Sequence, residues 1–161
     1  MHYWFGIALG GVALVGSAVA LVLLVLAVSN AGVTSIAGAV VLLLSVGMYA
    51  FGILSGVEAF RCAPTWHRPA RVFWFAQVPM LLSPIASWAL YCGPAIWIYV
   101  HQSSSRFGLG ATVSFGAGQE LLLFGGPQYL VLGVNIVALV VAVVLHRIAS
   151  KPDPGGSPSA F

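Results

Sequence analysis

The most constraining feature of this sequence is a set of long apolar stretches that contain no Asp, Glu, Lys or Arg. They cover about residues 4–28, 35–57, 72–100 and 127–146. A helix needs roughly 20 apolar residues to cross about 30 Å of hydrocarbon, and each stretch reaches that length. We therefore predict an all-α integral membrane protein, a four-transmembrane-helix bundle.

The composition of the chain also favours a lipid environment over water. Of its 161 residues, 60% are hydrophobic and 6% are charged, whereas a soluble domain carries about a quarter charged residues. The net charge of +3 rests on six Lys and Arg residues, too few and too scattered for a nucleic-acid surface. We expect contacts with membrane lipids and none with nucleic acid.

The positions of the basic residues predict how the chain crosses the membrane. Arg61, Arg68 and Arg71 lie between the second and third stretches, and Arg147 and Lys151 follow the fourth. The two remaining connections contain a single basic residue, Arg106. Because cytoplasmic loops are enriched in Lys and Arg, we predict a multi-pass protein of the bacterial plasma (inner) membrane with both termini in the cytoplasm (N-in/C-in).

The predicted outer loop, about residues 102–126, has a pattern of its own. Residues 107–118 alternate between apolar side chains and Gly, Thr or Ser, which is the period of a strand with one apolar face. We predict a small β-hairpin that turns at 116–119 and returns over 120–124. A flexible glycine-rich loop is the alternative.

The domain organisation is simple. We expect residues 1–148 to form a single membrane domain. The stretch 149–161 is rich in Pro, Gly and Ser, so we expect a disordered cytoplasmic tail.

Small residues recur on one face of the second predicted helix, at Gly38, Ser45, Gly52 and Gly56, and the first helix contains Gly6 and Gly10. Small side chains let helices approach closely in lipid. This pattern predicts close helix packing within the chain or between copies of it.

Neutral polar residues interrupt the apolar stretches, and five of them form a candidate intramembrane polar cluster. They are Tyr49, Gln77, Ser83, Ser87 and Asn135. We expect Asn135 to bond across helices at the level of Ser83 or Ser87, because an unpaired amide in hydrocarbon costs several kcal/mol. Such residues favour polar contacts that hold the bundle together, and the alternative is a pocket for a small solute or lipid.

The second candidate site is a basic and aromatic loop on the predicted cytoplasmic side. It contains Arg61, Trp66, His67, Arg68 and Arg71. Side chains of this kind set membrane orientation and contact anionic headgroups. Docking of a protein partner is the alternative.

The sequence contains no pattern that specifies a reaction. The predicted spans lack the ionisable groups on which proton relays and ion-coupled carriers depend. Glu58, Cys62 and His67 match no standard zinc spacing, so we predict no catalytic residue, metal or cofactor.

We therefore predict a non-enzymatic accessory or assembly subunit that acts through contacts with lipids or other membrane proteins, alone or as a homo-oligomer. The alternatives are an oligomeric channel or uncoupled carrier, and a lipid-modifying enzyme.

Overall fold

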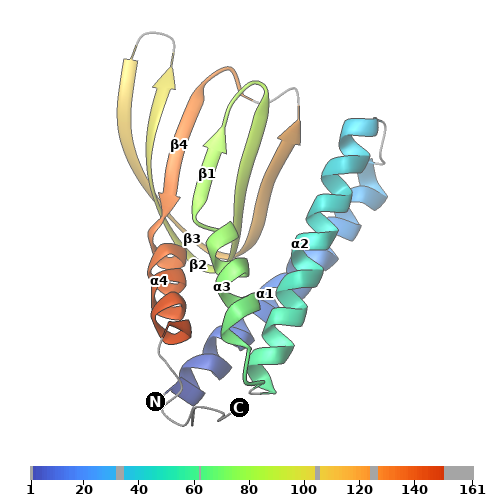
Figure 1. Ribbon diagram of the computed structural model, residues 1–161. Helices are drawn as coiled ribbons and strands as arrows, with labels where there is room; N and C mark the ends of the chain where they lie inside the picture. Colours follow the sequence, from blue (N-terminus) through green and yellow to red (C-terminus); the bar gives the residue numbers. More distant parts are fainter. Residues whose placement is uncertain (1, 32–34, 62, 104–105, 124–126, 151–161) are drawn as a thin grey trace, which may run out of the picture.

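The computed structural model describes residues 2–31, 35–61, 63–103, 106–123 and 127–150 (Figure 1). Within them the chain forms helices and strands in the order α1 (His2–Ala31), α2 (Ile36–Phe60), α3 (His67–Ala76), β1 (Pro79–Leu82), β2 (Ala86–Ser103), β3 (Arg106–Leu123), β4 (Leu130–Asn135) and α4 (Ile136–Ala149). The prediction of an all-α, multi-pass four-helix bundle is therefore wrong. Cys62 and the predicted tail from residue 151 onward lie outside the described residues.

The first two predicted helices correspond to α1 and α2. Among the described residues, these two helices are long and apolar enough to cross a membrane. They pack antiparallel through small residues. A side-chain carbon added at Gly10 would lie 2.8 Å from the Cβ of Ala59 and 3.0 Å from the carbonyl oxygen of Gly56. The small-residue faces are thus used for close packing within one chain.

The predicted third helix, 72–100, is instead a short helix followed by two strands. α3 ends at Ala76, β1 begins at Pro79, and β2 runs through Pro94. Proline removes a backbone donor and disfavours helical geometry in the residue before it. The helix accordingly ends before the first of these prolines.

The predicted fourth helix, 127–146, likewise divides into strand β4 and helix α4. The change occurs at Asn135, whose backbone is extended and whose side-chain Oδ1 accepts hydrogen bonds from Val137 N (3.1 Å) and Ala138 N (3.3 Å). Asparagine is among the strongest N-cap residues. It therefore starts α4 one residue after the strand ends.

The alternating segment 107–118 lies within strand β3, but the predicted hairpin is wrong in its partner and its turn. Residues 120–123 continue β3 and do not return along it. The partner is β2, paired antiparallel from Ala86↔Leu123 to Ser103↔Arg106. Sequence alternation identified the strand and could not identify the segment that pairs with it.

The four strands form one antiparallel sheet in the order β1-β4-β2-β3, and the sheet curls. β2 pairs with β4 over one half of its length and with β1 at Trp88 and Ala89 in the other half, while β1 and β4 also pair with each other. The long β2–β3 ribbon bends around them (Figure 1). At the bend Gly93 faces Gly116, and both have positive φ (100° and 120°), which glycine adopts at little cost.

The two faces of the curled sheet differ in chemistry. The outer face of β3 is apolar and highly exposed, with Phe107 at 74% and Phe115 at 86%. On the inner face, Tyr99 lies over Gly110 and His101 over Gly108, each directly across the β2–β3 ladder.

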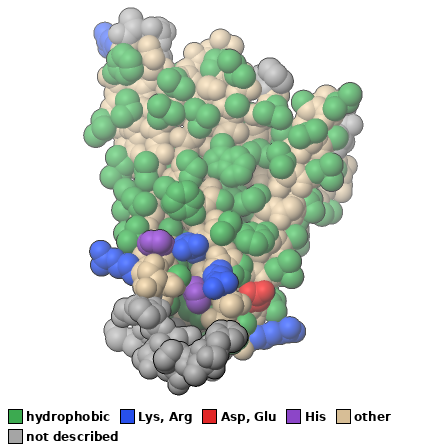
Figure 2. All heavy atoms as spheres, viewed as in Figure 1, with side chains coloured by type: hydrophobic (Ala, Val, Ile, Leu, Met, Phe, Trp, Pro, Cys, Tyr) green, Lys and Arg blue, Asp and Glu red, His purple; other side chains and the backbone are tan. Residues whose placement is uncertain are grey.

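Charged side chains gather at one end of the molecule, below the apolar surface of the helices and sheet (Figure 2). This charged end combines the end of α2, the start of α3 and the end of α4. Its residues are Glu58, Arg61, His67, Arg68, Arg71, His146 and Arg147. Arg106 begins β3 at the opposite end (Figure 1).

Candidate functional site

Gln77 and Asn135, two of the five predicted polar residues, lie at neighbouring junctions between helix and strand. Gln77 is fully buried after α3, and its Oε1 accepts a hydrogen bond from Cys92 N at 2.7 Å. The backbone N–H of Asn135 donates to Val78 O at 2.8 Å. These amides satisfy backbone groups in an apolar interior, so the contacts support a structural role.

Of the other three predicted residues, Tyr49 belongs to the same buried core cluster as Cys92, the hydrogen-bond partner of Gln77. The Ser83 hydroxyl, beyond the far end of β1, donates to Ala86 O at 2.7 Å. Ser87 and Tyr49 are both buried. Asn135 pairs with Trp97 across the β2–β4 ladder, and its side chain accepts from the first turn of α4. Its expected level beside Ser83 or Ser87 stays a prediction.

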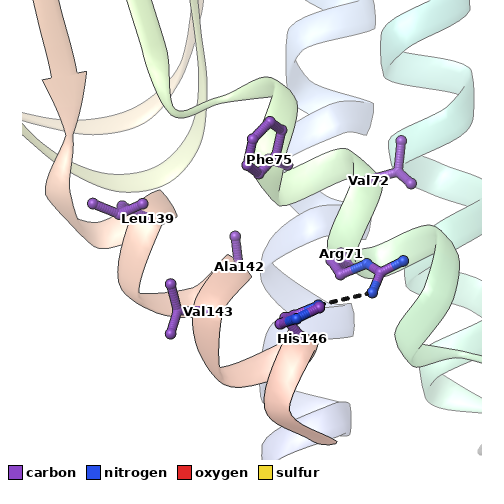
Figure 3. Close-up of a pocket in the computed structure, with 7 residues that line it drawn as sticks. All are labelled: Arg71, Val72, Phe75, Leu139, Ala142, Val143 and His146. Carbon is purple, nitrogen blue, oxygen red and sulfur yellow. Dashed lines mark hydrogen bonds between the residues drawn. The ribbon is translucent and has the colours of Figure 1, made fainter. Parts of the chain in front are cut away.

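A groove lies between α3 and α4 (Figure 3). Its volume is about 430 Å³, within the range of small-molecule pockets. The lining residues are Arg71, Val72, Phe75, Leu139, Ala142, Val143 and His146. The middle and one end are hydrocarbon, and the two polar groups lie together at the other end (Figure 3).

The polar end of the groove is formed by Arg71 and His146, whose side chains point toward each other (Figure 3). Arg71 Nη1 lies 3.1 Å from His146 Nδ1. A guanidinium has donors and no acceptor, so Arg71 donates this hydrogen bond to His146 Nδ1. The pair presents a positive charge at the mouth of an apolar groove.

The rest of the predicted basic loop lies around this mouth. Arg61 and Arg68 are exposed, and Trp66 packs against Gly6 of α1. The rings of Trp66 and His67 meet edge to face, with centroids 6.3 Å apart. Of the five predicted residues, Arg71 alone lines the groove, while the others belong to the charged end that surrounds it.

Sequence reasoning missed the α4 side of the groove. The groove residues of α4 are spaced so that they share one face of a helix. They are Leu139, Ala142, Val143 and His146. That spacing was visible in the sequence. The pairing of this face with Arg71, which is 75 residues away from His146, was not.

The groove offers one guanidinium, one imidazole and otherwise hydrocarbon. This set suits an amphiphile with an apolar chain and an anionic head. Comparison with known proteins adds no assignment, since no protein-family model, curated protein or solved structure matches the chain.

Proposed function

We propose that this protein is a non-enzymatic membrane protein that binds an anionic lipid in the groove between α3 and α4. The observation that carries the proposal is the position of Arg71 and His146 at one end of an otherwise apolar groove. In this arrangement an acyl chain lies along Phe75, Leu139 and Val143, and the anionic head meets Arg71. Guanidinium groups bind phosphate and carboxylate oxygens with charge-assisted hydrogen bonds.

The proposed membrane placement follows from α1 and α2. Both cross the bilayer, and the charged end lies on the cytoplasmic side of a bacterial inner membrane, because four of the six Lys and Arg residues are found there. The groove then opens toward the cytoplasmic leaflet. Its polar end is at headgroup level, and its apolar part extends into hydrocarbon.

Contacts between the helices and the sheet support the depth in the bilayer that we propose for each element. Gly16, midway along α1, lies against Cys92, and Ser45 of α2 accepts a hydrogen bond from Gln119 Nε2 at 2.8 Å. The bend of the sheet is therefore near the bilayer centre. α3 and α4, with 10 and 14 residues, rise about 15 and 21 Å from the charged end, which is close to the thickness of one leaflet.

The first prediction tests the charged end of the groove. Purified protein in neutral detergent is titrated with phosphatidylglycerol, and binding is measured by native mass spectrometry. We expect Arg71→Gln to weaken binding about tenfold, because it removes a charge-assisted hydrogen bond. Arg147→Gln is the matched control, since it removes the same charge from the charged end but does not line the groove.

A second pair of variants tests whether the lipid occupies the groove. Val143→Trp fills the groove from its exposed wall, and Val144→Trp places the same ring on a neighbouring position outside it. The proposal expects loss of binding in the first variant only. Equal losses from Arg71→Gln and Arg147→Gln, or full binding by Val143→Trp, would contradict it.

A further inference from the structure

The inner face of the curled sheet contains a second cavity, with a volume of about 480 Å³. We call it the inner cavity, and all four strands contribute to it. Its lining residues are Met80 and Leu82 of β1, Tyr99 and His101 of β2, Thr112 of β3, Val131 of β4, and Tyr129 just before β4. His101 is two residues from Ser103, which pairs with Arg106. The inner cavity therefore lies toward the end of the molecule opposite the charged end.

The strand register places the lining residues side by side. Tyr99 pairs with Gly110 of β3 on one side and with Gly133 of β4 on the other. Val131 of β4 pairs with His101 of β2, and β1 continues the same face beyond β4. Directly opposed residues of an antiparallel pair share one face of a sheet, so the wall of the cavity is one continuous surface.

Glycines beneath this surface make room for its aromatic rings. A side-chain carbon added at Gly110 would lie 2.6 Å from the ring of Tyr99, and one added at Gly133 would lie 2.8 Å from Tyr99 Cβ. Gly108 lies against the imidazole of His101 in the same way. Larger residues at these positions would displace both rings. The alternation of glycine along β3 thus serves the inner face, where the rings of β2 lie against the backbone.

One polar atom of the cavity wall has no partner. His101 Nδ1 is buried and forms no hydrogen bond within the described residues. The nearest aromatic ring, that of Tyr99, has its centroid 6.2 Å from the centroid of the imidazole. A buried polar atom without a partner is costly, and most such atoms in proteins are satisfied. A ligand hydroxyl would satisfy Nδ1 in either tautomer of the imidazole, because it both donates and accepts.

The lining side chains define the class of ligand. No Asp, Glu, Lys or Arg of the described residues lines the cavity, so it does not suit an ion. Two phenol rings and one imidazole favour a planar ring, which packs on aromatic side chains by offset or edge-to-face contact. A sugar would bury many hydroxyls that each need a partner, and the cavity has only four polar side chains.

From these observations we propose that the inner cavity binds an uncharged phenol. The ring of the phenol lies beside Tyr99 and Tyr129, and its hydroxyl forms a hydrogen bond with His101. The hydrocarbon part of the ligand contacts the apolar side chains of β1 and β4. The inference goes beyond lipid binding in the groove and does not depend on it, since the two sites share no residue.

Binding of thymol, a phenol with two alkyl substituents, tests the proposal in the full chain. The protein is reconstituted in nanodiscs, and uptake is measured by equilibrium dialysis in sealed cells, with uptake by empty nanodiscs subtracted. We expect saturable binding of thymol and about tenfold weaker binding of p-cymene, which has the same skeleton without the hydroxyl. Thymol uptake equal to that of empty nanodiscs, or equal binding of the two compounds, would overturn the proposal.

A substitution at His101 tests the polar contact. His101→Phe keeps an aromatic ring and removes both nitrogens. It is expected to weaken thymol binding about tenfold and to leave p-cymene binding unchanged. A purely structural role of His101 would instead change the binding of both compounds equally, and that result would contradict the proposed hydrogen bond.

A pair of tryptophan variants tests the position of the ligand. Thr112→Trp fills the inner cavity, whereas Val113→Trp places the same ring on the opposite face of β3, because successive residues of a strand point to opposite faces. Val113 is 77% exposed and does not line the cavity. We expect loss of thymol binding in the first variant only. Equal losses in both variants, or full binding by a folded Thr112→Trp variant, would refute the site, and His101→Phe keeps it testable if Thr112→Trp does not fold.

Discussion

Gln77 and Asn135 lie at the two junctions between helix and strand, and their side-chain amides accept hydrogen bonds from buried backbone donors. A helix end leaves its first donors and last acceptors without partners. In an apolar interior those groups need protein partners, because an unpaired polar group there is costly. Asn135 supplies an acceptor to the first turn of α4, and Gln77 supplies one to Cys92 in β2.

Replacement of the Asn135 side chain tests this role. We expect Asn135→Ala to lower the free energy of unfolding by about 1–2 kcal/mol, because Val137 N and Ala138 N lose their acceptor. Asn135→Ser retains a capping oxygen and is expected to lose much less. Unfolding is followed by circular dichroism in detergent, and equal losses in the two variants would show that capping is not the role of this side chain.

Among the elements, the β2–β3 ribbon decides the shape of the sheet. Its bend at Gly93 and Gly116 lets one strand, β2, pair with β4 on one side of the bend and with β1 on the other. A residue with a side chain rarely adopts φ values near those of these glycines. The bend therefore depends on glycine at a facing pair of positions.

A substitution at Gly116 isolates the cost of that backbone conformation. A carbon added at Gly116 would contact nothing within 4 Å, so Gly116→Ala introduces strain without a steric clash. We expect a loss of about 1–3 kcal/mol in unfolding free energy. Gly47→Ala is the matched control, because Gly47 has the same open surroundings in the middle of helix α2. A loss in both variants, or in neither, would refute the conformational explanation.

At the scale of the whole molecule, the two short helices α3 and α4 and the sheet lie at different levels along the hairpin of α1 and α2 (Figure 1). α3 and α4 lie between the charged end and the bend, and the arms of the sheet extend from the bend toward Arg106 (Figure 1). Each of the two apolar stretches after Arg71 thus combines a short helix with strand. The charged end and Arg106 come to lie at opposite ends of the molecule.

Labelling of single cysteines tests this arrangement. In spheroplasts and a Cys62→Ser background, we expect a membrane-impermeant maleimide to modify Arg106→Cys from outside. Arg147→Cys should react only after the membrane is permeabilised, because the proposed placement puts the charged end in the cytoplasm. Labelling of both positions from the same side of an intact membrane would contradict the proposed placement.

The candidate site was only partly predictable. The sequence identified Arg71 as a candidate because it is a charged residue in a basic loop between two apolar stretches. The opposite wall of the groove consists of apolar residues of α4 that have no distinctive sequence pattern. The groove exists only because α4 packs beside α3. His146 was visible as a residue at a helix end, but its contact with Arg71 depends on how α3 and α4 pack.

What the sequence determined by itself is the apolar character of the chain, the extent of α1 and α2, and the separation of the basic residues from Arg106. These follow from composition and length, which act locally. The tertiary structure alone decided that 79–103 and 130–135 are strands. An apolar run without polar positions suits helix and buried strand equally. The choice between them rests on hydrogen bonds between segments far apart in the chain, such as the pairing of β1 with β4.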